Sequence, residues 1–288
     1  MAGEAIVDWS RLVYLTTSTA AELVSGSKHA RTNGTAAAAT VVGRWTTLRR
    51  FDGHPGGTGA FTPSTSAVLT NTDNGAFRFT APATGARKRI SYVSACALVA
   101  GTLSVYDRLV ESGGANGTTP VSPTATTTNL PTAALTRRTD GVGVQAWVDI
   151  WTAIGATART LALNSYTNQA GTTGRVGAAT TFGGTGLNNQ DRTIRMPLAP
   201  GDYGVRAVAS LMLSASTATA GNYGLSLKYQ VATIPLAAAG LGFTFSWVMR
   251  KGGPFDLGVD SDAHLSLDWL SATTTAPDLN VDMFFLEQ

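Results

Sequence analysis

The sequence has few charged residues and almost no cysteine. Only 14% of its 288 residues are Asp, Glu, Lys or Arg, against about a quarter in a typical soluble domain. The single cysteine, Cys96, excludes an intrachain disulfide and a cysteine-based metal cluster, and the apolar run around it predicts a small buried side chain. Because 43% of the residues are hydrophobic and the net charge is only +3, the composition does not predict a disordered chain.

Long apolar segments are also missing. The most apolar stretch, 234–248, contains Pro235, Gly240 and Gly242 and is shorter than the roughly 20 residues of a membrane helix, so we expect no membrane span. The first residues lack the basic, apolar and cleavage regions of a signal peptide, so we expect no secretion. The chain instead contains 42 Thr, 43 Ala and 32 Gly, a composition unlike that of a charge-rich helical enzyme.

Charges of opposite sign are separated along the chain. Residues 1–251 contain all 21 Lys and Arg and 11 of the 18 acidic residues, whereas residues 252–288 contain the remaining seven acids. This split predicts that the acidic region contacts a basic surface on a neighbouring copy or on the same chain. The alternative is that its Asp side chains lie at solvated strand ends. The candidate residues for an electrostatic contact are Asp256, Asp260, Asp262 and Asp268.

The first 70 residues differ from the rest of the chain. Residues 8–15 and 18–24 each predict a short helix, the second ending at Gly26. Residues 31–65 are rich in Gly, Ala, Thr and Pro and show neither a helical nor a strand period. We therefore interpret residues 1–70 as an irregular N-terminal arm that makes intersubunit contacts, is ordered by a partner surface and contributes little to the folded body.

Residues 71–288 alternate apolar and polar side chains in short runs between turns. The clearest run, 223–231, places Tyr and Leu side chains on one face and Ser and Lys on the other, which predicts a half-buried strand. Residues 115–135 form a long Thr-, Pro- and Ala-rich loop, expected to be functional or flexible. Many strands without helical crossovers predict an all-β fold, an antiparallel β-sandwich or jelly-roll-like body. Further strands are predicted at 77–80, 103–109, 145–151, 159–167, 172–182, 193–198, 205–214, 243–250 and 265–269.

Patterns for metal binding and catalysis are weak. His29, His54 and His264 lack metal-ligand spacing, and the C-terminal Asp residues lack the order and terminal Glu of a calcium loop. Lys and Arg do not cluster with aromatic residues, which predicts no specific nucleic-acid partner. We therefore expect no metal, no cofactor and no enzymatic activity.

Trp147, Asp149 and Trp151 form the most distinctive local pattern, because alternation places all three on one face of a strand. We interpret this face as a subunit contact. Two alternatives are a buried core face and a carbohydrate-binding or carbohydrate-cleaving cleft. A hydrolytic pair would have to come from Asp107, Asp149 or Asp268, since only four Glu residues occur in the chain.

Three segments, 143–160, 166–175 and 198–224, resemble structural proteins of tailed bacteriophages. The likeness extends over about residues 75–250 and consists of strand-and-turn motifs, with Gly residues for turns and Trp147 and Tyr166 for packing. It implies a virion component and carries over no catalytic residue.

The resemblance alone leaves open whether the head or the tail carries the chain. Our leading hypothesis is a non-enzymatic head decoration or minor capsid protein, made in the host bacterial cytoplasm and located in the virion. Its partners would be the major capsid protein or tail proteins, together with further copies of itself in a homo-oligomer. A tail, baseplate or fibre-anchoring subunit is the alternative, and the carbohydrate-directed domain is a third hypothesis from a different class.

Overall fold

The computed structural model describes residues 21–32, 35–37, 39–56, 66–83, 88–246 and 258–287. This part of the chain is all-β and antiparallel, as predicted. It holds no helix, and hence none long and apolar enough to cross a membrane. The strands are β1 (Ala21–Lys28), β2 (Arg31–Thr32), β3 (Thr35–Ala36), β4 (Trp45–Thr47), β5 (Gly53–His54), β6 (Ala67–Val68), β7 (Lys88–Ala97), β8 (Gly101–Glu111), β9 (Val144–Thr152), β10 (Arg159–Asn168), β11 (Thr180–Phe182), β12 (Arg192–Arg195), β13 (Val205–Leu213), β14 (Asn222–Leu236), β15 (Gly242–Ser246), β16 (Gly258–Val259), β17 (Leu265–Ser271) and β18 (Leu279–Glu287).

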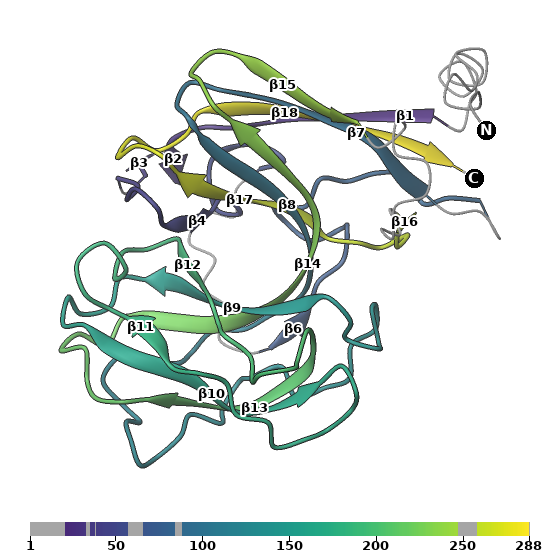
Figure 1. Cartoon of the computed structure of the whole chain (residues 1–288). Coiled ribbons are helices and arrows are strands. Elements are labelled where there is room, and N and C mark those ends of the chain that lie inside the picture. Colours follow the sequence, from purple (N-terminus) through teal and green to yellow (C-terminus); the bar gives the residue numbers. More distant parts are fainter. Residues whose placement is uncertain are drawn as a thin grey trace, which may run out of the picture.

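Six strands close into a barrel in the middle of the molecule (Figure 1). The strands β14, β9, β12, β4, β17 and β8 follow one another around it, and the pairing of β14 with β8 completes the ring. A closed ring leaves none of its strands as an edge, and it has an interior that side chains must fill.

A further sheet lies on each side of the barrel, so that the molecule has three layers (Figure 1). The larger sheet has the order β15-β7-β18-β1-β5, with β16 beside β7, and the smaller has the order β11-β10-β13. One apolar core joins β7 and β18 to barrel strands β8 and β17. The other joins β10 and β13 to barrel strands β9 and β14.

The long strand β14 contributes to both apolar cores. Leu225 belongs to the core beside the smaller sheet, and Ile234 belongs to the core beside the larger one. Between them the pairing with β8 shifts register after Leu227 and again after Gln230. Such irregularities bend a strand and change which face its side chains occupy, which explains how one strand can serve two layers.

The short helix predicted for residues 18–24 is wrong over residues 21–24, because these begin β1. This strand pairs along its whole length with β18, from Ala21 opposite Leu286 to Lys28 opposite Leu279. Local helix signals carry no information about a partner strand more than 250 residues away. Pairing with that strand here overrides the local preference. The other predicted helix, 8–15, lies outside the described residues.

The described part of the predicted N-terminal arm belongs to the folded body. Its strand β4 is one of the six strands of the barrel, and Leu48 and Phe51 are buried in the core beside the larger sheet. The expectation that this segment contributes little to the body is therefore wrong for residues 45–51. A three-residue strand is too short to show a period, which is why the pattern gave no sign of it.

The loop 115–135 covers an edge of the smaller sheet. Thr126 and Leu211 exchange two backbone hydrogen bonds of 2.8 and 3.0 Å, and Val208 donates one of 2.9 Å to the carbonyl of Pro131. The loop thus pairs with the outer side of β13, which would otherwise present unpaired backbone groups.

Candidate functional site

The face formed by Trp147, Asp149 and Trp151 points into the barrel. Their exposed fractions are 1%, 0% and 0%, while Val148 and Ile150 on the opposite face of β9 join the core beside the smaller sheet. Of the three interpretations of this face, a subunit contact and a carbohydrate cleft require accessible rings, and only the core interpretation fits this placement.

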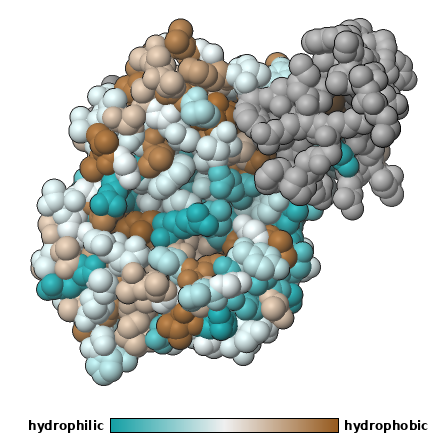
Figure 2. Space-filling model, in the orientation of Figure 1, coloured by the Kyte–Doolittle hydropathy of each residue, from teal (hydrophilic) through white to brown (hydrophobic). Residues whose placement is uncertain are grey.

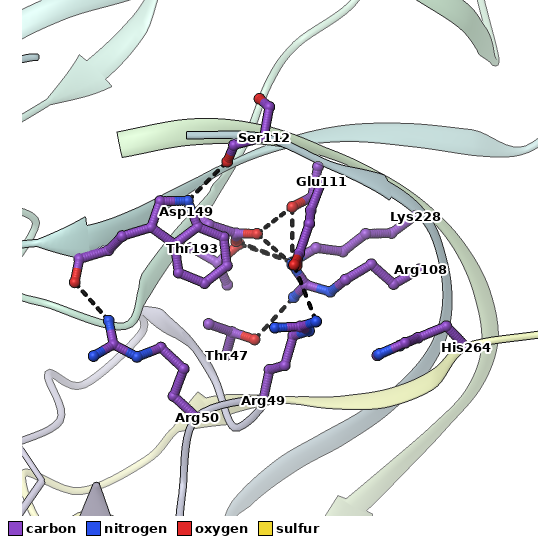
Figure 3. Close-up of polar contacts among 12 residues, drawn as sticks. Thr47, Arg49, Arg50, Arg108, Glu111, Ser112, Asp149, Thr193, Lys228 and His264 are labelled. Atoms are coloured by element: carbon purple, nitrogen blue, oxygen red, sulfur yellow. Dashed lines mark hydrogen bonds and ion pairs between the residues drawn. The ribbon is translucent and has the colours of Figure 1, made fainter. Parts of the chain in front are cut away.

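Asp149 lies at the centre of the barrel's polar contents (Figure 3). Its Oδ2 accepts hydrogen bonds from Arg108 Nη1, at 2.5 Å, and from the hydroxyl of Ser226, and its Oδ1 accepts one from Lys228 Nζ at 3.1 Å. Burial raises the pKa of Asp149, but the two cations and the hydroxyl outweigh burial and hold this pKa below its ordinary value. Asp149 is therefore ionised.

Lys228 has a second carboxylate partner on the other side. Its Nζ donates to Asp268 Oδ2 at 2.9 Å and to Thr193 Oγ1 at 3.1 Å. The Nζ also lies 5.2 Å from the centre of the Trp147 ring and 5.9 Å from that of Tyr106, within the range of a cation–π contact. The ammonium is thus held by groups from four other barrel strands.

Arg108 links the two ends of the network. Its guanidinium also donates to Thr47 Oγ1 at 2.9 Å and lies 3.5 Å from Glu111 and 3.7 Å from Asp268. Glu111 in turn lies 3.0 Å from Arg49 Nη2. Burial raises the pKa of Glu111, and Arg49 and Arg108 oppose this rise.

The formal charges of this buried network balance, with three cationic and three anionic side chains. All six side chains are 2% exposed or less. Desolvating charges is costly, and removing one partner of a buried pair typically costs about 3–5 kcal/mol because the other charge stays behind. We call these six residues the barrel network: Arg49, Arg108, Glu111, Asp149, Lys228 and Asp268.

A second buried ion pair lies beside the barrel network. Arg137 holds Asp107 through two hydrogen bonds, of 2.9 and 3.2 Å, and the backbone N–H of His264 donates to the same carboxylate at 3.1 Å. Burial lowers the pKa of His264 well below its ordinary value, and the nearby Arg49 and Arg108 lower it further. This histidine is therefore neutral.

Three of the four Asp residues predicted to make electrostatic contacts do so within the same chain. Asp260 lies 3.9 Å from Arg138, Asp262 lies 3.3 Å from Arg137, and Asp268 lies inside the barrel beside Lys228. Asp256 lies outside the described residues. The acidic region therefore meets basic groups of its own chain, one of the two possibilities that the charge split left open.

The remaining sequence candidates are scattered. His29 lies 3.8 Å from Asp278, His54 lies on β5, and Cys96 is half-buried rather than buried. Within the ranges that the structure describes, no group of three or more His, Cys, Asp or Glu residues is placed to hold a metal ion.

Sequence reasoning missed most of the barrel network, including Arg49, Arg108 and Glu111. It placed Lys228 on the solvent side of a half-buried strand, yet Lys228 and Ser226 are fully buried. The predicted separation of apolar and polar side chains on the two faces of β14 is correct, but the polar face lines a closed interior instead of facing water. Two signals were available in the sequence: Asp149 between two tryptophans, and the charge split that includes Asp268.

A scan against protein-family models, a search of curated proteins and a search of solved structures each found no match.

Proposed function

We propose that this chain is a non-enzymatic structural subunit of a tailed-bacteriophage particle, with a role in head decoration or as a minor capsid protein. The observation that carries the proposal is the closed barrel whose interior charges neutralise one another. The carboxylates that a hydrolase would need, Asp107, Asp149 and Asp268, are at most 3% exposed. They bind cations of the same chain, an arrangement suited to rigidity.

The phage-like segments support the same proposal. Residues 143–160 supply β9, and residues 198–224 supply β13 with the start of β14, so they form the barrel wall and the sheet packed against it. We also propose that the body is a jelly-roll-like sandwich, because antiparallel sheets pack against the barrel across two apolar cores.

Exposed apolar residues provide candidate contacts with other virion proteins or further copies of this chain. Leu98 and Leu241 are 66% and 56% exposed, and a hydrogen bond from Gly240 to Ala97 holds their two turns together. On the face that Figure 2 shows, apolar groups are interspersed with hydrophilic ones. A contact that covers both turns would bury these two side chains together, and burial of apolar surface favours association.

Labelling intact particles with an antibody against this chain, followed by negative-stain imaging, tests the proposal. Label on the head is expected. Label on the tail would favour a tail, baseplate or fibre-anchoring subunit, and purified particles that lack the chain would contradict a virion role altogether.

A pair of matched variants tests the contact. Leu98→Ser with Leu241→Ser is expected to reduce incorporation into particles while the melting temperature of the isolated protein stays unchanged. Val42→Ser, at a position 58% exposed and in another part of the fold, is the control and should be incorporated normally.

A further inference from the structure

Lys228 lies between two carboxylates in a place closed to water. Its Nζ is 2.9 Å from Asp268 Oδ2 and 3.1 Å from Asp149 Oδ1, and all three side chains are 0% exposed. The rings of Trp147 and Tyr106 lie beside the amine. A nucleophile held this close to a carbonyl carbon reacts as if its effective concentration were very high.

We propose that Lys228 Nζ condenses with Asp268 Cγ to form an isopeptide bond inside the barrel. The reaction is a single self-modification of the folded chain, with Asp149 as its acid–base group. The proposal is independent of the virion proposal, since it depends only on this geometry.

The surroundings of the two carboxylates decide which one reacts. Asp149 accepts hydrogen bonds from Arg108 and Ser226, so it stays ionised and resists a nucleophile. Its Oδ1 lies 3.1 Å from Lys228 Nζ, within reach of the proton that the attacking nitrogen must lose. Asp268 lies farther from Arg108, at 3.7 Å, and its Oδ1 accepts no hydrogen bond from the described part of the chain. Asp268 is therefore the electrophile and Asp149 the base.

The reaction balances without a co-reactant. One proton passes from the Lys228 ammonium to Asp268 Oδ2, leaving an amine and a carboxylic acid. The nitrogen attacks Cγ, and the negative charge that develops on Oδ1 faces the Arg108 guanidinium. Asp149 Oδ1 takes a second proton from Nζ and returns it to the departing Oδ2 hydroxyl. The products are one amide bond and one water molecule, and Asp149 is again a carboxylate.

The reaction also keeps the interior neutral. It removes one cation and one anion, so that Arg49 and Arg108 remain opposite Glu111 and Asp149. Loss of a buried charge pair lowers the desolvation cost of the fold. The new bond joins β14 to β17 across the intervening strand β8, and a cross-link of this kind stabilises by restricting the unfolded chain.

Mass spectrometry of the denatured full-length protein tests the proposal. The protein is incubated in its folded state before the measurement. The expected mass is that of the sequence less one water molecule. A tryptic digest should then contain residues 207–250 joined to residues 252–288, with no cleavage after Lys228.

Three variants complete the experiment. Lys228→Met should have the full mass of its own sequence and a lower melting temperature than the wild type. Lys28→Met, at another buried lysine, is the matched control and should still lose water. Asp149→Asn should slow the loss of water, because an amide does not accept the proton.

Two results would overturn the proposal. One is a wild-type mass equal to that of the sequence after prolonged incubation, which would leave Lys228 and Asp268 as an ion pair. The other is a loss of water that maps to Asp52-Gly53 or Asp140-Gly141, where a succinimide loses the same mass. Because the wild-type protein alone gives the decisive result, a variant that fails to fold does not affect the conclusion.

Discussion

Arg49 Nη2 lies 3.0 Å from Glu111 Oε1, and this buried contact joins the turn after β4 to the last residue of β8. Strand β8 pairs with β14, β17 and β6. The contact therefore fastens a segment with no recognisable sequence period to a strand that pairs with three others. Removing this contact by mutation therefore tests how much the barrel network contributes to the free energy of unfolding.

Replacing Glu111 with Leu is expected to lower the free energy of unfolding by about 3–5 kcal/mol, because Arg49 and Arg108 then lose a buried counter-charge. Denaturant titration measures the change. The double variant Arg49→Met with Glu111→Leu should recover part of the loss, and this coupling identifies the pair. Arg89→Met, at an exposed position on β7, is the control and should change stability by no more than about 0.5 kcal/mol. A similar loss in the control, or strictly additive effects, would contradict the prediction.

The second prediction concerns pH and Lys28, which is 1% exposed and donates hydrogen bonds to the carbonyls of Pro55 and Phe51 at 2.7 and 3.2 Å. Burial, reinforced by Arg49, lowers the pKa of this lysine to about 8 from 10.5. Between these two values the unfolded chain binds more protons than the folded chain. The contribution of Lys28 to stability is therefore constant below pH 8 and rises as the pH increases from 8 to 10.5.

Comparing wild type with Lys28→Met isolates this effect, because other titrating groups contribute equally to both proteins. The stability of the wild type, measured by denaturant titration, should rise relative to the variant by up to about 3 kcal/mol over this pH range. Parallel pH profiles for the two proteins would show that Lys28 titrates normally.

Trp147→Ala is expected to destabilise the isolated protein by about 3–5 kcal/mol, seen as a fall in melting temperature of roughly 6 °C or more. The ring makes edge contacts with Trp45 and Tyr106, at centroid distances of 5.8 and 5.7 Å, and its Nε1 donates to Gln145. Trp147→Phe keeps part of the ring and should lose less. An unchanged melting temperature combined with failed assembly would instead indicate a subunit contact.

The fourth prediction uses a close approach between two backbones. A Cβ placed on Gly224 would lie 1.8 Å from the carbonyl oxygen of Ser112, so β14 would have to move away from the backbone that directly follows β8. Gly224→Ala is therefore expected to cost about 1–3 kcal/mol or more. Gly242, whose Cβ would meet nothing within 4 Å, provides the control, and Gly242→Ala should be close to neutral. Equal melting temperatures for the two variants would contradict the prediction and show that the backbone around Gly224 can adjust.

Local sequence patterns were sufficient to predict the class of fold and the strands with the clearest alternation. Leu225 and Leu227 do share an apolar face on β14, and Leu265 and Leu267 share one on β17. Alternation reports which side chains lie on one face. It does not report what covers the other face, and so Lys228 was assigned to solvent although it is fully buried.

The residues of the candidate site come together only when the barrel closes, and no local sequence pattern predicts that closure. Arg108, Asp149 and Asp268 come from three strands separated by 41 and 119 positions, and each is unremarkable in its own segment. They meet only because β14 pairs with β8 as well as β9. The charge split gave a partial hint, since it predicted acidic partners for basic groups but not that some of these contacts would be internal.

The position of β18 between β7 and β1 sets the order in which this chain can fold during synthesis. Every residue of β1 has its main partner in residues 279–286, so β1 waits for almost the whole chain to emerge from the ribosome before it acquires a neighbour along its length. Barrel strand β4 likewise needs residues 268–270. Pairings this distant make folding slow and leave strands exposed in the meantime. The nascent chain is therefore open to premature association, and chaperone protection during translation would act on this interval.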